Sequence, residues 1–201
     1  MQCTTVLPGK GRPYLDGDSL DHGAALVMRV DGFLSDGECA REVERIAALG
    51  PEVAPISTAA GFVMRPDVRN NERVMFDDVA LASALFERLR PMLPDVLCGM
   101  VPVGVNERFR GYRYGPGQKF GAHYDGAFVR SRDERSLLTF MIYLDEGSTG
   151  GETRFLDHDV AVTPRRGTAL LFQHFLLHEG AELSAGRKHV LRSDVMYRTA
   201  A

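Results

Sequence analysis

The sequence predicts a mainly β fold with flanking α-helices. After Gly99, short runs of β-forming residues follow one another, with Gly, Pro and Asp between them. Before Gly99, two amphipathic stretches repeat their apolar residues at helical spacing. Many short strands with regular turns are typical of a β-sandwich or a double-sheet barrel, and we expect the helices to support it.

The chain has 201 residues, which suits one domain and is too short for two of ordinary size. Within this single domain, 1–201, we expect residues 1–98 to form an N-terminal arm and helical support, and residues 99–201 to form the β-core. The first 23 residues are rich in Gly, Pro and Asp, which predicts a loose arm. Leu26–Val30 predicts a short strand after it.

Two helices are predicted before the β-core. The first covers Ser35–Leu49, because Ser35 and Glu38 form an S-x-x-E capping box that satisfies free backbone donors. The second covers Val79–Arg90 and follows two aspartates, which stabilise the positive end of a helix. Both helices carry an apolar stripe that we expect to face the core, formed by Cys39, Val43, Ile46 and Ala47 in the first and by Leu81, Leu85 and Leu89 in the second.

The β-core is predicted to contain six short strands. Turns rich in Gly and Pro separate the runs, so the chain reverses direction repeatedly. The predicted strands are Glu107–Tyr114, Leu137–Leu144, Thr153–Leu156, Val160–Thr163, Thr168–Phe172 and His189–Tyr197.

Composition excludes several classes of protein. With 44% hydrophobic and 25% charged residues, the chain is neither disordered nor a coiled coil. A pI of about 6.1 disfavours a nucleic-acid partner, and no apolar run is long enough to predict a membrane span or a signal peptide. The three cysteines form no CxxC motif, so we expect a cytoplasmic protein whose metal ligands, if any, are His, Asp and Glu.

A candidate metal site begins at His123 and Asp125. These residues are two apart, and in an extended segment such residues point to the same side. His178 is the candidate third ligand, because the strands between Asp125 and His178 can return the chain to the first pair. Two histidines and one carboxylate on one face of an ion form the facial triad of non-haem Fe(II) oxygenases, which leaves positions open for other ligands.

A rival pair is formed by His174 and His178, which lie four residues apart as in zinc proteases. The glutamate that such a motif needs is replaced by Phe175, and the preceding residues predict a strand, so His174 is interpreted as structural. Glu179 and His189 are not expected to bind metal. Glu179 directly follows His178 and therefore points the other way in an extended chain.

A longer run of motifs surrounds these residues in order. It comprises Tyr114-Gly115, Gln118-Lys119-Phe120, His123-Tyr124-Asp125, Leu138–Leu144, Gly150–Phe155, Pro164, Gly167, Ala169–Phe172, His178-Glu179-Gly180, Gly186–Lys188 and Leu191–Tyr197. With these motifs, over roughly half of its length, the sequence resembles the 2-oxoglutarate- and Fe(II)-dependent oxygenases of the prolyl 4-hydroxylase type. The resemblance implies a double-stranded β-helix, or jelly roll, with flanking helices, in which residues 61–93 belong to the helical support.

The resemblance also implies cofactors and residue roles. It implies Fe(II), 2-oxoglutarate and O2, with ascorbate as a candidate reductant. Iron is assigned to His123, Asp125 and His178, and the distal carboxylate of 2-oxoglutarate to Lys188. Tyr114 and Tyr143 match tyrosines that border the cosubstrate, with plain core packing as the alternative interpretation.

Arg192 is the alternative partner for the distal carboxylate. Strand alternation places Lys188, Val190, Arg192 and Asp194 on one face of the last strand, so both cations can point inward. The offset of Lys188 from His178 matches the prolyl hydroxylase pattern, and Lys188 is therefore favoured. We expect an acid such as Asp194 to pair with Arg192, because an unpaired buried cation is costly.

The function implied is hydroxylation of a C–H bond, most like a prolyl 4-hydroxylase acting on a peptide or protein prolyl residue or on a small molecule. One alternative is a non-catalytic jelly-roll metal- or ligand-binding module, which the intact triad and Lys188 disfavour. Another is a hydrolase or isomerase that uses the same ligands with another metal, which Lys188 and the family motifs disfavour. Substrate selection is expected in the loops 57–71 and 126–136, which carry arginines. Solvated charge is the plainer interpretation of these arginines, and an acidic substrate group is the alternative.

Overall fold

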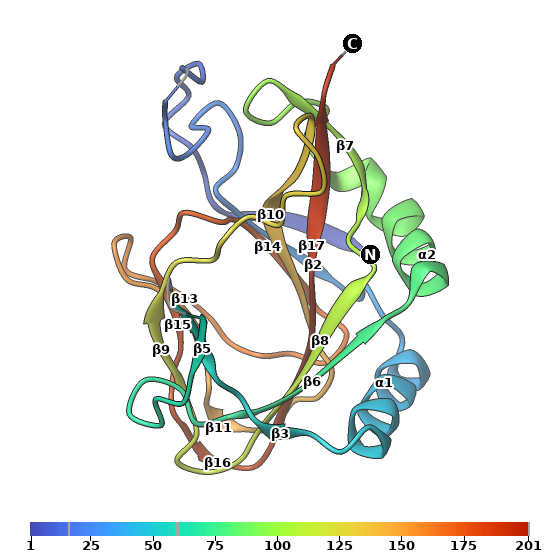
Figure 1. Ribbon diagram of the computed structural model, residues 1–201, viewed down its shortest axis with the longest axis vertical. Coiled ribbons are helices and arrows are strands. Elements are labelled where there is room, and N and C mark those ends of the chain that lie inside the picture. Colours follow the sequence, from blue (N-terminus) through green and yellow to red (C-terminus); the bar gives the residue numbers. More distant parts are fainter. Residues whose placement is uncertain (16, 59–60, 201) are drawn as a thin grey trace.

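The computed structural model describes residues 1–15, 17–58 and 61–200. Two antiparallel sheets lie across from each other, and both long helices pack on the outer face of the larger sheet (Figure 1). This arrangement is the jelly-roll core with flanking helices that the sequence predicts.

The larger sheet has nine strands and forms the centre of the molecule. Its order is β1-β2-β14-β10-β17-β8-β6-β3, and β7 also pairs with β17. The strands are β1 (Gln2–Leu7), β2 (Val27–Asp31), β3 (Glu52–Val53), β6 (Glu72–Asp77), β7 (Met100–Val105), β8 (Arg108–Tyr114), β10 (Glu134–Tyr143), β14 (Ala169–Gln173) and β17 (Lys188–Thr199).

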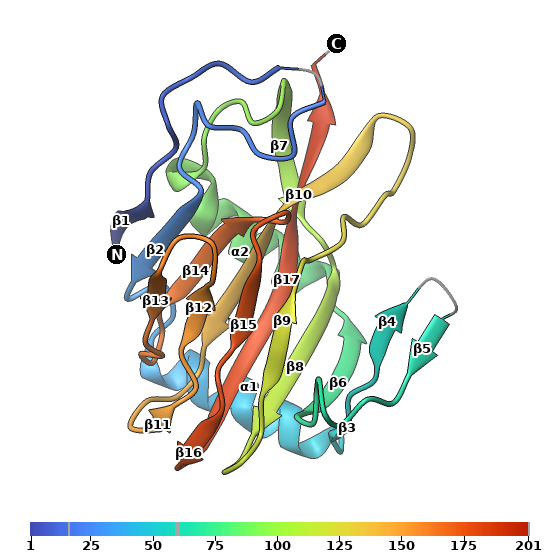
Figure 2. The same cartoon turned by 90° about the vertical axis from the view of Figure 1, so that its left-hand side faces the viewer.

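The smaller sheet has the order β13-β12-β15-β9 and covers the inner face of the larger one (Figure 2). Two short ribbons accompany it, β11 with β16 and β4 with β5, and the second projects away from the sheets (Figure 2). These strands are β4 (Ile56–Thr58), β5 (Gly61–Val63), β9 (Phe120–His123), β11 (Thr149–Gly150), β12 (Thr153–Phe155), β13 (Val160–Val162), β15 (His178–Gly180) and β16 (Leu183–Ala185).

The helices α1 (Asp36–Ala48) and α2 (Val79–Leu89) lie where the sequence predicts them, and a short 3-10 turn, Arg90–Met92, follows α2. The capping box forms: the Ser35 hydroxyl accepts from the Glu38 amide, and the Glu38 carboxylate accepts from the Ser35 amide at 2.8 Å. No helix among the described residues is long and apolar enough to cross a membrane.

Strand alternation divides the interior into two cores. On β10, the side chains of Leu138, Phe140 and Ile142 pack toward the helices. Tyr143 of the same strand packs in the second core, between the sheets, and Thr139 faces the same side. Because both faces of the larger sheet are buried, any polar side chain on its inner face needs a polar partner or a ligand.

Three expectations about the N-terminal half are wrong. Residues 2–7 form β1 instead of a loose arm, because they pair with β2. The region 61–93 is helical only in its second half, since β5 and β6 precede α2. The division near residue 98 does not separate helices from strands, because β1, β2, β3 and β6 join the larger sheet. Long-range pairing, which local composition does not encode, decides these segments.

Gly111 of β8 allows α1 to pack closely on the sheet. A methyl group at this position would lie 2.5 Å from Ile46 Cγ1 and 2.9 Å from Val74 Cγ2. We therefore expect Gly111→Ala to lower the free energy of unfolding by about 1–3 kcal/mol in urea titrations, through overpacking. Gly104→Ala in β7 is the control, since a methyl group there meets no atom within 4 Å. An equal loss in both variants would contradict the close packing.

Candidate active site

Three candidate metal ligands meet at one edge of the smaller sheet. His123 ends β9, His178 begins β15, and the antiparallel pairing of these strands sets the two residues opposite each other. Asp125 follows β9, and its backbone amide donates to the His174 carbonyl at 3.1 Å. One ligand atom from each of His123, Asp125 and His178 lies within 4.8 Å of the others. The predicted triad is thus brought together.

Backbone carbonyls orient both imidazole rings. The Nδ1 atom of His123 lies 2.8 Å from the Gly121 carbonyl oxygen, and Nδ1 of His178 lies 2.9 Å from that of Leu176. A carbonyl can only accept, so Nδ1 carries the proton and Nε2 keeps its lone pair. The Nε2 atoms face Asp125, at 3.7 Å for His123 and 3.5 Å for His178.

Burial keeps the histidines in the neutral form that binds metal. Desolvation lowers the pKa of His123 to about 3, with a further contribution from His178. Desolvation also lowers the pKa of His178. At neutral pH neither ring therefore has to lose a proton before it binds a cation.

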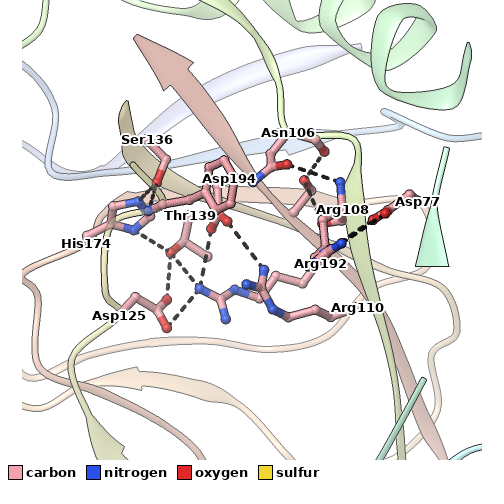
Figure 3. A network of polar contacts seen from close by, with 12 residues as sticks. Asp77, Asn106, Arg108, Arg110, Asp125, Ser136, Thr139, His174, Arg192 and Asp194 are labelled. Atoms are coloured by element: carbon pink, nitrogen blue, oxygen red, sulfur yellow. Dashed lines mark hydrogen bonds and ion pairs between the residues drawn. The ribbon is translucent and has the colours of Figure 1, made fainter. Parts of the chain in front are cut away.

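Asp125 is a buried carboxylate held by two donors (Figure 3). The Thr139 hydroxyl donates to Oδ2 at 2.6 Å, and Nη2 of Arg192 lies 2.9 Å from Oδ1. Burial alone would raise the pKa of Asp125. The charge of Arg192, the two neighbouring histidines and the Thr139 hydrogen bond together outweigh burial and hold the pKa far below its usual value. Two neutral imidazoles and one ionised carboxylate form a donor set that fits Fe(II).

His174 lies behind this site and belongs to its support. Its Nδ1 is 3.0 Å from the Thr139 hydroxyl and its Nε2 is 2.8 Å from the Ser136 hydroxyl (Figure 3). Both ring nitrogens are therefore occupied, which confirms the interpretation of His174 as structural. Thr139 connects His174 to Asp125, a link that the sequence analysis missed.

Glu179 and His189 point to other partners, as predicted. Glu179 of β15 lies opposite Arg154 of β12 and forms an ion pair with it, with 3.7 Å between Oε1 and Nη1. Nδ1 of His189 lies 2.6 Å from Oδ2 of Asp145. Neither joins the cluster formed by the triad.

An inner cavity between the sheets extends from the triad to Lys188. Lys188 is 2% exposed; its ammonium donates to the Gly151 carbonyl at 2.8 Å and lies 4.1 Å from the ring centroid of Tyr114. In the described part of the chain no carboxylate forms an ion pair with it. Burial lowers the pKa of Lys188 to about 8, so the ammonium stays charged at neutral pH.

Glycines keep space around this ammonium. A methyl group on Gly151 would lie 3.5 Å from Nζ of Lys188, and one on Gly180 would lie 3.7 Å from it. A buried cation with room beside it and no acidic partner fits the distal carboxylate of a dicarboxylate such as 2-oxoglutarate.

The other predicted cosubstrate residues differ in their surroundings. Tyr114 lines the inner cavity. Tyr143 does not: it is fully buried and its hydroxyl lies 2.7 Å from that of Thr153, so its position fits core packing. Arg192 faces inward as predicted, but its guanidinium already lies beside Asp125 and Asp194, the latter at 3.5 Å. This difference favours Lys188 over Arg192 for the distal carboxylate.

A second, outer cavity of about 470 Å³ lies on the other side of the triad. Several residues of its wall were not singled out from the sequence, among them Arg73, Arg110 and Tyr112. The two cavities share five lining residues, namely Tyr112, Phe120, His123, Asp125 and Arg192. The candidate metal ligands His123 and Asp125 therefore lie where the cavities meet.

The predicted substrate loops have different environments. In the loop 126–136, Arg130 forms ion pairs with Glu134 and Glu107, as expected for a charge on the surface. In the segment 57–71, Arg69 is only 4% exposed and lines the outer cavity, so its charge is not solvated. Residues 59–60 of this segment lie outside the described part of the chain.

Comparison with known proteins agrees with this site. Residues 109–193 match the model of the 2OG-Fe(II) oxygenase superfamily. The structure is similar to a viral collagen prolyl hydroxylase from Paramecium Bursaria Chlorella virus-1 in a 2OG complex, with 23% identity over 86% of this chain and 96% of that chain and a TM-score of 0.57. A search of the curated proteins finds no match.

Two further solved structures share the fold. A Pseudomonas putida prolyl-4-hydroxylase is 21% identical over 87% of this chain and 93% of its own, with a TM-score of 0.61. A Trichoplax adhaerens prolyl hydroxylase, in complex with a hypoxia inducible factor peptide fragment, is 17% identical over 85% of this chain and 83% of its own, with a TM-score of 0.65.

The match to the 2OG-Fe(II) oxygenase superfamily covers residues 109–193, and these include the three triad residues and Lys188. The enzyme class is that of the 2-oxoglutarate-dependent dioxygenases, whose cofactors are Fe(II), 2-oxoglutarate and O2.

Measurements of Fe(II) affinity distinguish the candidate metal ligands from the residues that support them. We expect His178→Ala to abolish Fe(II) binding, because the variant leaves only two of the three candidate ligands. Calorimetry under anaerobic conditions measures this binding. His174→Ala should still bind Fe(II), with an affinity lowered by about 10- to 100-fold, since it removes a group that positions Thr139 and through it Asp125. His158→Ala, outside the cluster, is the control. Unchanged binding in His178→Ala would refute the assignment.

Proposed function

We propose that this chain hydroxylates a C–H bond of a prolyl residue in a peptide or protein, or of a related small molecule, with His123, Asp125 and His178 as the iron ligands. The observation that carries the proposal is that two triad residues, His123 and Asp125, line both cavities, while His178 lines the inner one. The inner cavity ends at Lys188, a buried cation that has no acidic partner among the described residues, and this suits the cosubstrate. The outer cavity is larger and suits the substrate.

The side chains of this protein have distinct tasks in the proposed reaction. When bound, Fe(II) with 2-oxoglutarate and O2 supplies oxidative decarboxylation to succinate and CO2, coupled to oxygen insertion into a C–H bond. His123 and His178 would present Nε2 to the ion, because carbonyl oxygens accept their Nδ1 protons. Lys188 would hold the distal carboxylate, with Tyr114 beside it.

The walls of the inner cavity restrict water. Phe120, Met141, Phe172 and Val190 line it together with the polar groups. Phe120 stacks on the His123 ring, with centroids 3.6 Å apart. An apolar lining strengthens the attraction between Lys188 and a carboxylate, because little solvent screens the two charges.

The prolyl substrate is proposed by analogy with proteins of the same fold. The solved structures similar to this chain include a collagen prolyl hydroxylase and a prolyl hydroxylase in complex with a peptide fragment. The outer cavity combines apolar residues, such as Ile56, Phe62 and Val68, with polar ones. Such a lining can accept the apolar ring of a prolyl group.

We also propose that the protein works in the cytoplasm. Its three cysteines are free, and Cys3 is exposed, which suits a reducing compartment. Such a compartment also favours the ferrous state. Cell fractionation would test this placement.

Succinate formation tests the proposed reaction. With Fe(II), 2-oxoglutarate and a library of proline-containing peptides and small molecules, we expect succinate under aerobic conditions and none without O2. The product should gain the mass of one oxygen atom. Tight metal binding without succinate would support a non-catalytic module, and a product without added oxygen would indicate a hydrolase or isomerase.

Lys188→Gln tests the partner of the distal carboxylate. Because the variant removes a buried charge-assisted hydrogen bond, the KM for 2-oxoglutarate should rise by about 10- to 100-fold. The Fe(II) affinity should stay nearly constant, since Lys188 does not contact the triad. Arg192→Gln should alter Fe(II) binding instead, through Asp125. If Arg192→Gln raises this KM and Lys188→Gln is silent, Arg192 holds the carboxylate.

The low pKa of Lys188 predicts a pH dependence of cosubstrate affinity. Its pKa of about 8 lies below the ordinary lysine value, so the ammonium is charged below this pH and neutral above it. The affinity for 2-oxoglutarate, titrated anaerobically with Fe(II), should be constant near pH 7 and fall about tenfold per pH unit above pH 8. Lys188→Gln should bind weakly with no such decline. A decline that persists in the variant would assign the effect to another group.

A further inference from the structure

The wall of the outer cavity carries more positive than negative charge. Four arginines line it, and Asp125 is the single carboxylate among its described lining residues. The arginines are Arg69, Arg73, Arg110 and Arg192. Arg110 and Arg192 have acidic partners, whereas Arg69 and Arg73 have none among the residues that the structure describes.

Arg110 and Arg192 lie opposite each other on the paired strands β8 and β17. Like charges in this position repel, but Asp194 lies between them (Figure 3). Its Oδ2 is 3.3 Å from Nη1 of Arg110, and its Oδ1 is 3.5 Å from Nη2 of Arg192. With Asp125 also beside Arg192, these two arginines have acidic partners within the protein.

Arg69 has no acidic partner among the described residues. It is 4% exposed, and its Nε donates to the amide oxygen of Asn71 at 2.8 Å. Its Nη2 is buried and lacks a hydrogen-bond partner in the described part of the chain. The guanidinium lies 4.1 Å from the ring centroid of Phe120, the ring that stacks on His123. A single aromatic ring thus separates this cation from a candidate iron ligand.

Arg73 is half-buried on β6, opposite Tyr112 of β8. It forms no ion pair with a described carboxylate, and the ring of Phe62 lies 6.0 Å from its guanidinium. Burial, together with the neighbouring arginines, lowers the pKa of Arg73. Burial alone would raise the pKa of Tyr112, but the charges of the neighbouring arginines together outweigh burial and lower this pKa to about 8.

A buried guanidinium without an anion is unfavourable, and a carboxylate is the planar anion that matches its paired N–H groups. On the basis of the proposed function, we infer that the substrate carries a carboxylate, which Arg69 and Arg73 recognise in the outer cavity, and that this group positions the C–H bond at the metal. Arg69 does not line the inner cavity, so this carboxylate differs from those of 2-oxoglutarate. It can belong to a free imino acid or to an acidic side chain near the reacting prolyl residue.

Two matched pairs of probes distinguish these sources. The first pair is L-proline and its amide; the second is a blocked Gly-Pro-Glu tripeptide and its Gly-Pro-Gln counterpart. Binding is measured by calorimetry on the full chain with Fe(II) and 2-oxoglutarate under anaerobic conditions, so that no turnover occurs. We expect the acidic member of at least one pair to bind about tenfold or more tightly than its neutral partner. Preference within the first pair identifies a free acid, and within the second an acidic peptide.

Variants assign the preference to the two arginines. Arg69→Gln and Arg73→Gln should each reduce the preference for the acidic probe over its neutral partner by about tenfold. The affinity for 2-oxoglutarate should not fall by a comparable amount. Arg65→Gln is the matched control, because Arg65 belongs to the same segment, pairs with Asp67 at 2.6 Å and does not line the cavity. If the buried Arg69→Gln variant does not fold, the half-buried Arg73→Gln decides.

Several outcomes would overturn the inference. Equal binding within both pairs, no binding of either acidic probe at millimolar concentration, or an undiminished preference in Arg73→Gln would each do so. Loss of 2-oxoglutarate affinity in Arg69→Gln would assign Arg69 to the cosubstrate instead. Succinate formation with neutral substrates alone would contradict the inference but not the proposed function. If no substrate gave O2-dependent succinate formation, the proposed function itself would be wrong.

Discussion

Buried charge is the constraint on which this site depends. Asp125 is ionised because Arg192 and Thr139 hold it, and Arg192 in turn shares Asp194 with Arg110. These charges are balanced within the protein. Lys188 and Arg69 are buried as well, yet the described residues offer them no carboxylate. Because unpaired buried cations are costly, the proposed carboxylates of 2-oxoglutarate and of the substrate would complete both positions.

The strand β17 places several of these charges where they meet. Its residues Lys188, Val190 and Arg192 face the inner cavity, while Leu191 and Val195 pack toward the helices. Apolar packing on one face thus fixes the direction of charged side chains on the other. The smaller sheet completes the site from the opposite side, since the pairing of β9 with β15 sets His123 against His178.

Local patterns account for the elements that the sequence predicts well. The capping box and the leucine stripe correctly locate α1 and α2, and continuous β-forming runs locate β8, β10, β14 and β17. The predictions are wrong for residues 2–7 and for the first half of the region 61–93, because β1 and β6 are held by neighbours that lie far away in sequence. Short strands carry too little periodicity to reveal such partners.

For the site, the sequence by itself identified the candidate metal ligands, since H-x-D and a distant histidine within a run of motifs are local chemical features. It also determined, through two-residue alternation, that Lys188 and Arg192 share a face. Only the tertiary structure decided that Arg192 forms an ion pair with Asp125, whereas Lys188 forms no ion pair with a described carboxylate. It also decided that Tyr143 packs in the core and that Arg69 is buried near the triad. The physical reason is that burial and charge pairing depend on contacts between segments that are distant in the chain.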